Sequence, residues 1–126
     1  MNLNKIASVL AFIIGAMAIF AGGQVVLLGK EMNYHVINWL PYYNFTVGLI
    51  TFLVTALLIW KNNRYAMPAA IATFAAHALV MATLLIGYQG VVAPESIKAM
   101  TVRLVVWAVI LILMYLQTRN NKQATA

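Results

Sequence analysis

The sequence predicts an all-α fold, an integral membrane bundle of four helices with a short interfacial segment between the first two. Of the 126 residues, 64% are hydrophobic and only 8% are charged, whereas soluble domains carry about 25% charged residues. The apolar residues form four runs, and each is long enough to cross a bilayer at roughly 20 residues per crossing. The connections between the runs are brief, so we expect a single transmembrane domain, 1–126, without a soluble domain.

The first predicted helix spans about 6–28. Small residues recur along it at intervals of four, four, three and four, and therefore fall on one face. They are Ala7, Ala11, Gly15, Ala18 and Gly22. A face of small residues lets a second helix approach closely within a membrane. Aromatic residues then crowd into 34–43, which is typical of the headgroup level. We therefore predict an amphipathic interfacial segment that ends at Pro41.

The second predicted helix spans about 44–60 and carries a mild polar stripe that should face the bundle. The stripe consists of Asn44, Gly48, Thr51 and Thr55. The third predicted helix, about 66–88, is rich in alanine on nearly every side, and His77 lies at its centre. Because a helix poor in bulky side chains gains more from close contact with other helices than from lipid, we expect it to be the inner helix.

The fourth predicted helix spans about 96–116 and is built of large residues such as Leu104, Trp107 and Ile110. Without a face of small residues, it should expose more surface to lipid or to another subunit. Residues 118–126 form a polar tail that we expect to fray.

Basic residues predict the orientation. Those beside one set of helix ends are Lys5, Lys61, Arg64, Arg119 and Lys122, and those on the other side are Lys30, Lys98 and Arg103. An excess of Lys and Arg in short loops marks the cytoplasmic side, so both termini should be cytoplasmic. The net charge of +6 is explained by this distribution, and the expected partner is the lipid bilayer and no nucleic acid.

The strongest candidate for a functional residue is His77, because an ionisable side chain near the bilayer midplane is costly unless it has a partner. It could relay protons, bind haem or a metal, or donate to a quinone carbonyl. The alternative is a structural imidazole hydrogen-bonded to Thr73, Thr51 or Thr55.

Arg103 is the second candidate, with Gln24 at a similar depth on the first helix. The guanidinium could pair with Glu95, eight residues earlier, or snorkel to the headgroups. It could instead bind an anionic headgroup or substrate. Glu31, His35 and Glu95 are weak candidates for a carboxylate–imidazole metal site. The chain has no cysteine, which excludes thiolate ligands.

Several features are shared with a known family. They are the glycine-bearing first helix, the longer loop after it, Val47-Gly48-Leu49 in the second crossing and the short basic loop at 61–64. In these respects the chain resembles the DoxX-like family of small four-helix bacterial membrane proteins. The resemblance implies a bacterial inner-membrane location, and some members of that family are associated with quinone-linked oxidoreductases. It transfers no catalytic residue to this chain.

Taken with the absence of a nucleophile that has a base beside it, these features favour a non-catalytic membrane subunit or accessory protein that binds a hydrophobic ligand, such as a lipid or a quinone. The sequence identifies no cofactor. One alternative is a small oligomeric transporter or channel whose pathway is lined by the second helix. Another is an enzyme that acts on lipid or uses a metal. A homo-oligomer or a larger membrane complex is compatible with the first two.

Overall fold

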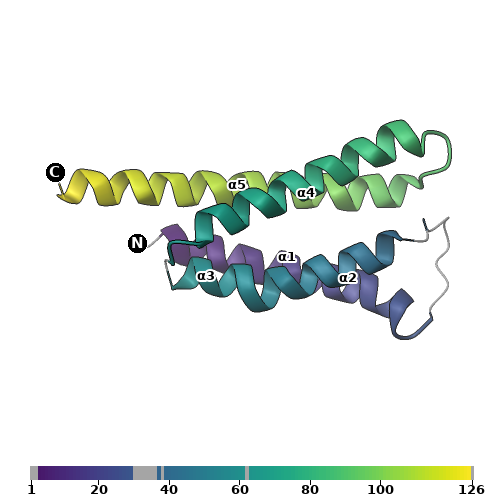
Figure 1. Cartoon of the computed structure of the whole chain (residues 1–126), viewed down its shortest axis with the longest axis horizontal. Helices are drawn as coiled ribbons and strands as arrows, with labels where there is room; N and C mark the ends of the chain where they lie inside the picture. The colour runs from purple at the N-terminus through teal and green to yellow at the C-terminus, as the bar shows by residue number, and fades with distance from the viewer. Residues whose placement is uncertain (1–2, 30–36, 38, 62, 126) are drawn as a thin grey trace.

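The computed structural model describes residues 3–29, 37, 39–61 and 63–125, and beyond Arg119 it describes the backbone alone. All secondary structure in these residues is helical (Figure 1). The elements are α1 (Leu3–Val26), α2 (Leu40–Ile50), a single π-helical turn η1 (Thr51–Thr55), α3 (Ala56–Trp60), α4 (Ala66–Gly87) and α5 (Pro94–Thr125). α2, η1 and α3 run on as one crossing, Leu40–Trp60.

Four helical segments are long and apolar enough to cross a membrane: Leu3–Val26, Leu40–Trp60, Ala66–Gly87 and Pro94–Arg119. Large apolar side chains such as Phe20, Leu79 and Ile86 are exposed on the outside of the bundle. Such a surface is unfavourable in water and is expected against lipid. The chain is therefore a multi-pass membrane protein folded as a four-helix bundle, as the sequence predicts.

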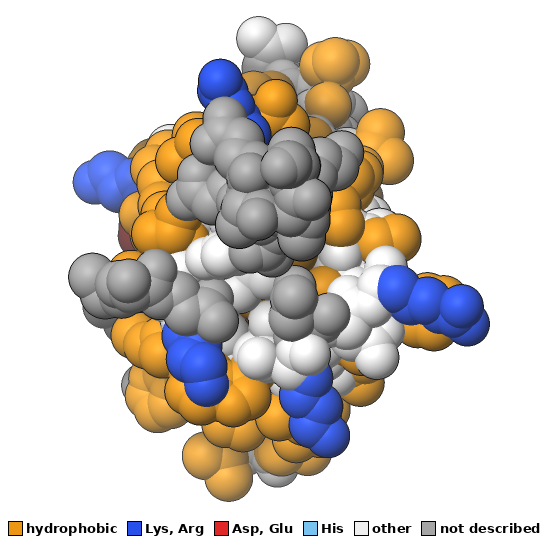
Figure 2. Space-filling model, turned by 90° about the vertical axis from the view of Figure 1, so that its left-hand side faces the viewer, with side chains coloured by type: hydrophobic (Ala, Val, Ile, Leu, Met, Phe, Trp, Pro, Cys, Tyr) orange, Lys and Arg blue, Asp and Glu red, His pale blue; other side chains and the backbone are white. Residues whose placement is uncertain are grey.

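Both termini and the α3–α4 connection lie at one end of the bundle, and the α4–α5 connection lies at the other (Figure 1). Basic side chains mark the termini end. The Lys5 ammonium lies 4.1 Å from the centroid of the Trp60 ring, and Arg64 donates a hydrogen bond of 2.7 Å to the Tyr65 hydroxyl. Figure 2 shows this end, where Lys and Arg side chains project around a largely apolar rim.

The central helix is α1, and the prediction that the alanine-rich helix is the inner one is wrong. In the most apolar window of each helix, 44% of the α1 residues are buried but only 22% of the α4 residues. α1 packs against α2, η1, α3 and α5, whereas α4 packs mainly against α5. The reason is the distribution of small residues: those of α1 form one continuous face, whereas the alanines of α4 are spread around the helix and concentrate contact on no side.

The face of small residues on α1 receives α2, as predicted. A Cβ atom added at Gly22 would lie 2.5 Å from both the Phe45 nitrogen and the Pro41 carbonyl oxygen. One added at Gly48 would lie 2.8 Å from the Ile19 nitrogen. The backbones of α1 and α2 therefore touch where both partners lack a side chain, which is the close approach that small residues allow in membranes.

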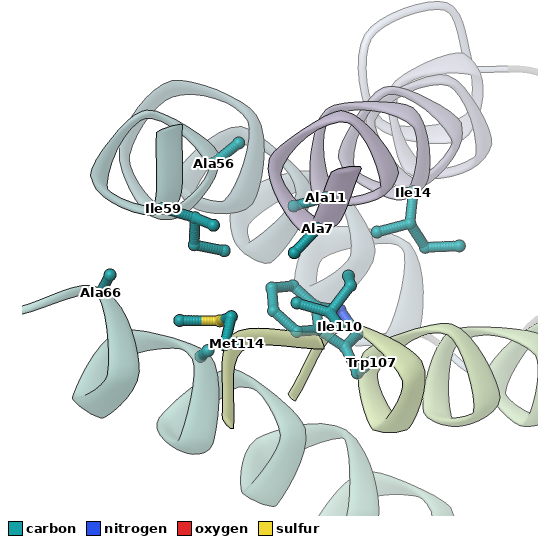
Figure 3. Packing of buried hydrophobic residues seen from close by; sticks show 10 residues of the cluster. Ala7, Ala11, Ile14, Ala56, Ile59, Ala66, Trp107, Ile110 and Met114 are labelled. Carbon is teal, nitrogen blue, oxygen red and sulfur yellow. The ribbon is translucent and has the colours of Figure 1, made fainter. Parts of the chain in front are cut away.

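An apolar core fills the half of the bundle nearest the termini (Figure 3). Trp107 and Ile110 of α5 lie next to Ala7 and Ala11 of α1, and Met114 lies nearer Ile59 and Ala66. The large residues of α5 thus fill the space that the alanines of α1 leave. The spacing of three and four residues along α5 places these side chains on one seam, as in other closely packed helix pairs.

Two boundaries differ most from the predictions. The second crossing begins at Leu40 and not near 44, because Pro41 occupies the first turn of α2, where its missing N–H costs nothing. Pro41 therefore begins a helix instead of ending an interfacial segment, whose own residues 30–36 and 38 lie outside the described residues. α5 continues to Thr125, so the polar tail does not leave the helix at 118. No glycine or proline interrupts 117–125, and the Leu3 N–H donates to the Gln117 side chain over 2.7 Å.

Candidate functional site

Four polar side chains meet inside the half of the bundle that lies away from the termini. Tyr43 and Asn44 come from the first turns of α2, His77 from the middle of α4 and Arg103 from α5. The Tyr43 hydroxyl and the His77 Nδ1 are joined by a hydrogen bond of 2.7 Å, and Arg103 Nη1 donates to the Asn44 Oδ1 over 2.6 Å. We refer to these four residues as the polar cluster.

The helices position the polar cluster through local sequence features. Because Pro41 starts α2 early, Tyr43 and Asn44 already lie on regular helix, about 100° apart at 3.6 residues per turn. One side chain therefore reaches α4 and the other α5. Arg103 occupies the same seam of α5 as Trp107, one turn away, and so points into the bundle. It is only 5% exposed, and His77 is 4% exposed.

The imidazole of His77 has a different partner from those predicted. Its hydrogen bond runs to Tyr43, and the two rings meet edge to face with centroids 5.7 Å apart. The hydroxyl of Thr73 bonds instead to the Ala69 carbonyl, one turn earlier on its own helix, over 2.8 Å. A threonine hydroxyl satisfied by its own helix has no need of a partner across the bundle.

Two cavities lie against the polar cluster. The larger, of about 60 Å³, is a partly open cleft between α1, α2 and α5. We call it the Arg103 cleft. Ala21 and Val25 of α1, Asn44 of α2 and Glu95 and Arg103 of α5 are among its lining residues.

The smaller cavity, of about 10 Å³, lies deeper and is lined among others by Gly15, Thr51 and His77. We call it the His77 cavity. Its volume corresponds to about one water molecule. Asn44 and Arg103 line both spaces, so their hydrogen-bonded pair forms the partition between the Arg103 cleft and the His77 cavity.

The other predicted site residues lie at varied distances from this centre. Thr51 lines the His77 cavity, and both Thr51 and Thr55 are buried, as the polar-stripe prediction requires. Gln24 is half-buried on α1 and is not among the described residues that line either cavity. Glu95 lines the Arg103 cleft at the start of α5.

The metal-site prediction involves Glu31 and His35, which lie outside the described residues. Among residues 3–29, 37, 39–61 and 63–125, no three His, Asp or Glu side chains lie close enough to hold a metal ion. The metal site at Glu31, His35 and Glu95 therefore stays a prediction.

Two members of the polar cluster, Tyr43 and Asn44, are not among the predicted site residues. Tyr43 was grouped with the interfacial aromatics and Asn44 with the polar stripe, although both are here the direct partners of the candidates His77 and Arg103. The available signal was Pro41, because a proline in the first turn of a helix would have placed both residues inside the crossing.

Arg103 gives the site its chemical character. A guanidinium offers five N–H donors in a planar fork, and the bond to Asn44 orients that fork without neutralising its charge. Such a group binds carboxylate, phosphate or carbonyl oxygens, with the strongest bonds to anions. Tyr43 and His77 form a second hydrogen-bonded pair behind the partition.

Fold and site together define a small multi-pass membrane protein with a polar cluster buried among its helices. Comparison with protein-family models, with curated proteins and with solved structures finds no match to this chain. The resemblance to the DoxX-like family accordingly stays a prediction.

Proposed function

We propose that this chain is a non-catalytic membrane protein, a subunit or accessory protein, that binds a hydrophobic ligand with a polar head, such as a lipid or a quinone. The head lies in the Arg103 cleft and accepts hydrogen bonds from the guanidinium. The observation that carries the proposal is the position of Arg103, which is 5% exposed and still lines a cleft of about 60 Å³.

The walls of the Arg103 cleft suit an amphiphile. Ala21 and Val25 on α1, with Leu40 and Met100 opposite, are apolar, while Asn44 and Arg103 supply polar contacts. Binding sites for such ligands typically combine an apolar lining with a few convergent polar groups. An arginine placed inside a membrane bundle is costly, and residues of this kind commonly mark a ligand or ion site.

The proposed setting is a bacterial inner membrane with both termini in the cytoplasm. The basic residues Lys5, Lys61 and Arg64 at the termini end support this orientation, since cytoplasmic loops carry an excess of Lys and Arg. The Arg103 cleft would then open toward the outer face. A reporter fused after Ala126 should give the cytoplasmic signal, and a periplasmic signal would reverse the proposed orientation.

The alternative of a transporter or channel would use the polar stripe of the second crossing as a pathway. Within the single chain, however, Thr51 is 2% exposed and Thr55 is 1% exposed. The space beside Thr51 is the His77 cavity of about 10 Å³. These values favour a ligand held in the Arg103 cleft over passage along the stripe.

The test is retention of a native amphiphile. The protein is purified in mild detergent, and bound lipid and quinone are identified by native mass spectrometry and solvent extraction. Arg103→Gln should lower retention about tenfold or more, because hydrogen bonds to charged groups contribute about 1.5–3 kcal/mol. The matched control is Arg64→Gln, which removes an exposed guanidinium at the termini end and should leave retention unchanged.

A second variant keeps the test decisive if Arg103→Gln does not fold. Ala99 is exposed and lines the Arg103 cleft. Ala99→Phe fills the cleft and leaves the guanidinium in place, so it should lower retention as well. Retention of the same amphiphile at wild-type level by Ala99→Phe would contradict the proposed site.

A further inference from the structure

The Arg103 cleft contains charges of both signs. Arg103 is the buried charge of the cleft. Glu95 lies eight residues earlier, at the start of α5. At a rise of 1.5 Å per residue, their Cα atoms are separated by about 12 Å along the helix axis. Eight residues leave the two side chains about 80° apart around the helix axis, and both line the cleft.

The residues between the two charges leave the cleft open. Ala99 lies on the same face, halfway between Glu95 and Arg103, and ends at its Cβ. Ser96 also lines the cleft and adds a hydroxyl that can donate or accept. The Arg103 guanidinium bonds to Asn44, which also lines the cleft. The cleft therefore presents a cationic group and an anionic group with the small side chains of Ser96 and Ala99 between them in sequence.

We infer that the ligand head is a phosphate–ammonium zwitterion, with its phosphate on Arg103 and its ammonium on Glu95. This inference rests on the proposed function. The order of charges supports it: in an ethanolamine phospholipid the phosphate is nearer the acyl chains than the ammonium, and in the cleft the cation lies deeper than the anion. A phosphate and an ammonium joined by two carbon atoms, with hydrogen bonds of about 2.8 Å at both ends, fit the gap.

Two other heads fit less well. A purely anionic head such as phosphatidylglycerol would place no positive group beside the Glu95 carboxylate. A quinone ring would leave Glu95 without a role, because its carbonyls accept hydrogen bonds and an ionised carboxylate cannot donate one. The zwitterion is the head that offers an opposite charge to both Arg103 and Glu95.

The test is competitive lipid retention by the detergent-purified full chain. Equal amounts of phosphatidylethanolamine and phosphatidylglycerol of matched chains are added, and the bound lipids are counted by native mass spectrometry. The wild type should prefer phosphatidylethanolamine about tenfold, and Glu95→Gln should remove that preference while lipid is still retained. The control is Lys98→Gln, which removes an exposed charge close to Glu95 but outside the cleft lining and should keep the preference.

Free phosphoethanolamine distinguishes the source of the head. If it displaces bound phosphatidylethanolamine at millimolar concentration, the same head chemistry is supported with a water-soluble source; if it does not, a membrane lipid is supported. Equal or stronger retention of phosphatidylglycerol by the wild type, or a preference unchanged in Glu95→Gln, would overturn the zwitterion. Equal retention of amphiphile by the wild type and Arg103→Gln would instead overturn the proposed function itself.

Discussion

The two ends of the bundle are held together differently. At the termini end, apolar side chains interdigitate in a large core to which α5 contributes Trp107, Ile110 and Met114. At the opposite end, a smaller apolar cluster around Leu40 and Leu84 lies beside the cavities and the polar cluster, and the helices are also held by backbone contact at Gly22 and by the hydrogen bonds of Tyr43 and Arg103.

The half near the termini stabilises the fold, and the other half contains the proposed ligand site. A half joined at glycines can keep a cleft between α1, α2 and α5 without losing its helix contacts. Substitutions in the apolar half should therefore lower stability, whereas substitutions in the Arg103 cleft should lower ligand retention.

The largest effect is expected where backbones touch. Gly22→Ala places a Cβ atom 2.5 Å from backbone atoms of α2, which cannot rotate away. Separation of α1 from α2 should lower the free energy of unfolding by about 3 kcal/mol or more. Gly87→Ala is the control, since a Cβ atom there meets nothing within 4 Å. Denaturant titration in detergent measures both, and similar stability of the two variants would contradict the close contact.

The next effect concerns the apolar half. Ile110→Ala empties a fully buried position between α1 and α5 and should cost about 2 kcal/mol, near the lower end for core truncations because lipid replaces water as the solvent of the unfolded helices. Ile112→Ala, at an exposed position of the same helix, should change stability by less than about 0.5 kcal/mol. An equal loss in both variants would show that the apolar core does not hold this end.

The fold could be predicted from the sequence to a large extent, because bilayer crossings are determined by length and hydropathy. The arrangement of the helices was harder to predict. The one-sided small residues Ala11, Gly15 and Ala18 correctly indicated close packing on α1, but the abundance of alanine in α4 wrongly suggested a central position. The number of small residues in a helix indicates how closely another helix can approach it. Their position around the helix determines on which side that contact forms.

A smaller effect is expected from the polar cluster. Tyr43→Phe removes the hydroxyl bonded to His77 and should cost about 1 kcal/mol, because the imidazole nitrogen loses its partner inside the bundle. Tyr42→Phe removes an exposed hydroxyl from the neighbouring position and should be near neutral. The same unfolding titration compares them, and a larger loss in Tyr42→Phe would contradict the buried pair.

The smallest effect is expected at Ser8, whose hydroxyl donates to the Ala56 carbonyl just after the π-helical turn, over 2.7 Å. Ser8→Ala should cost about 0.6 kcal/mol, a typical value for a hydrogen bond between helices in a membrane. Thr101→Ala, which removes a bond within a single helix, is the comparison. A larger loss of stability in Ser8→Ala than in Tyr43→Phe would contradict the expected order of the two hydrogen bonds.

The candidate site was only partly predictable. His77 and Arg103 were identified because ionisable residues are rare inside membranes. Their partners were not, since Tyr43 and Asn44 are separated from them by 34 and 59 residues and meet them only through helix packing. The cleft itself is lined by residues of α1, α2 and α5, which come together only through helix packing.

The most direct test measures both ligand retention and the free energy of unfolding in two variants, one from each half of the bundle. Arg103→Gln should lose the bound amphiphile while its helix content and monodispersity are kept, and Ile110→Ala should keep the amphiphile while its free energy of unfolding falls. If Arg103→Gln retains the ligand, or if Ile110→Ala loses the ligand without losing stability, the proposed separation of binding from support is contradicted.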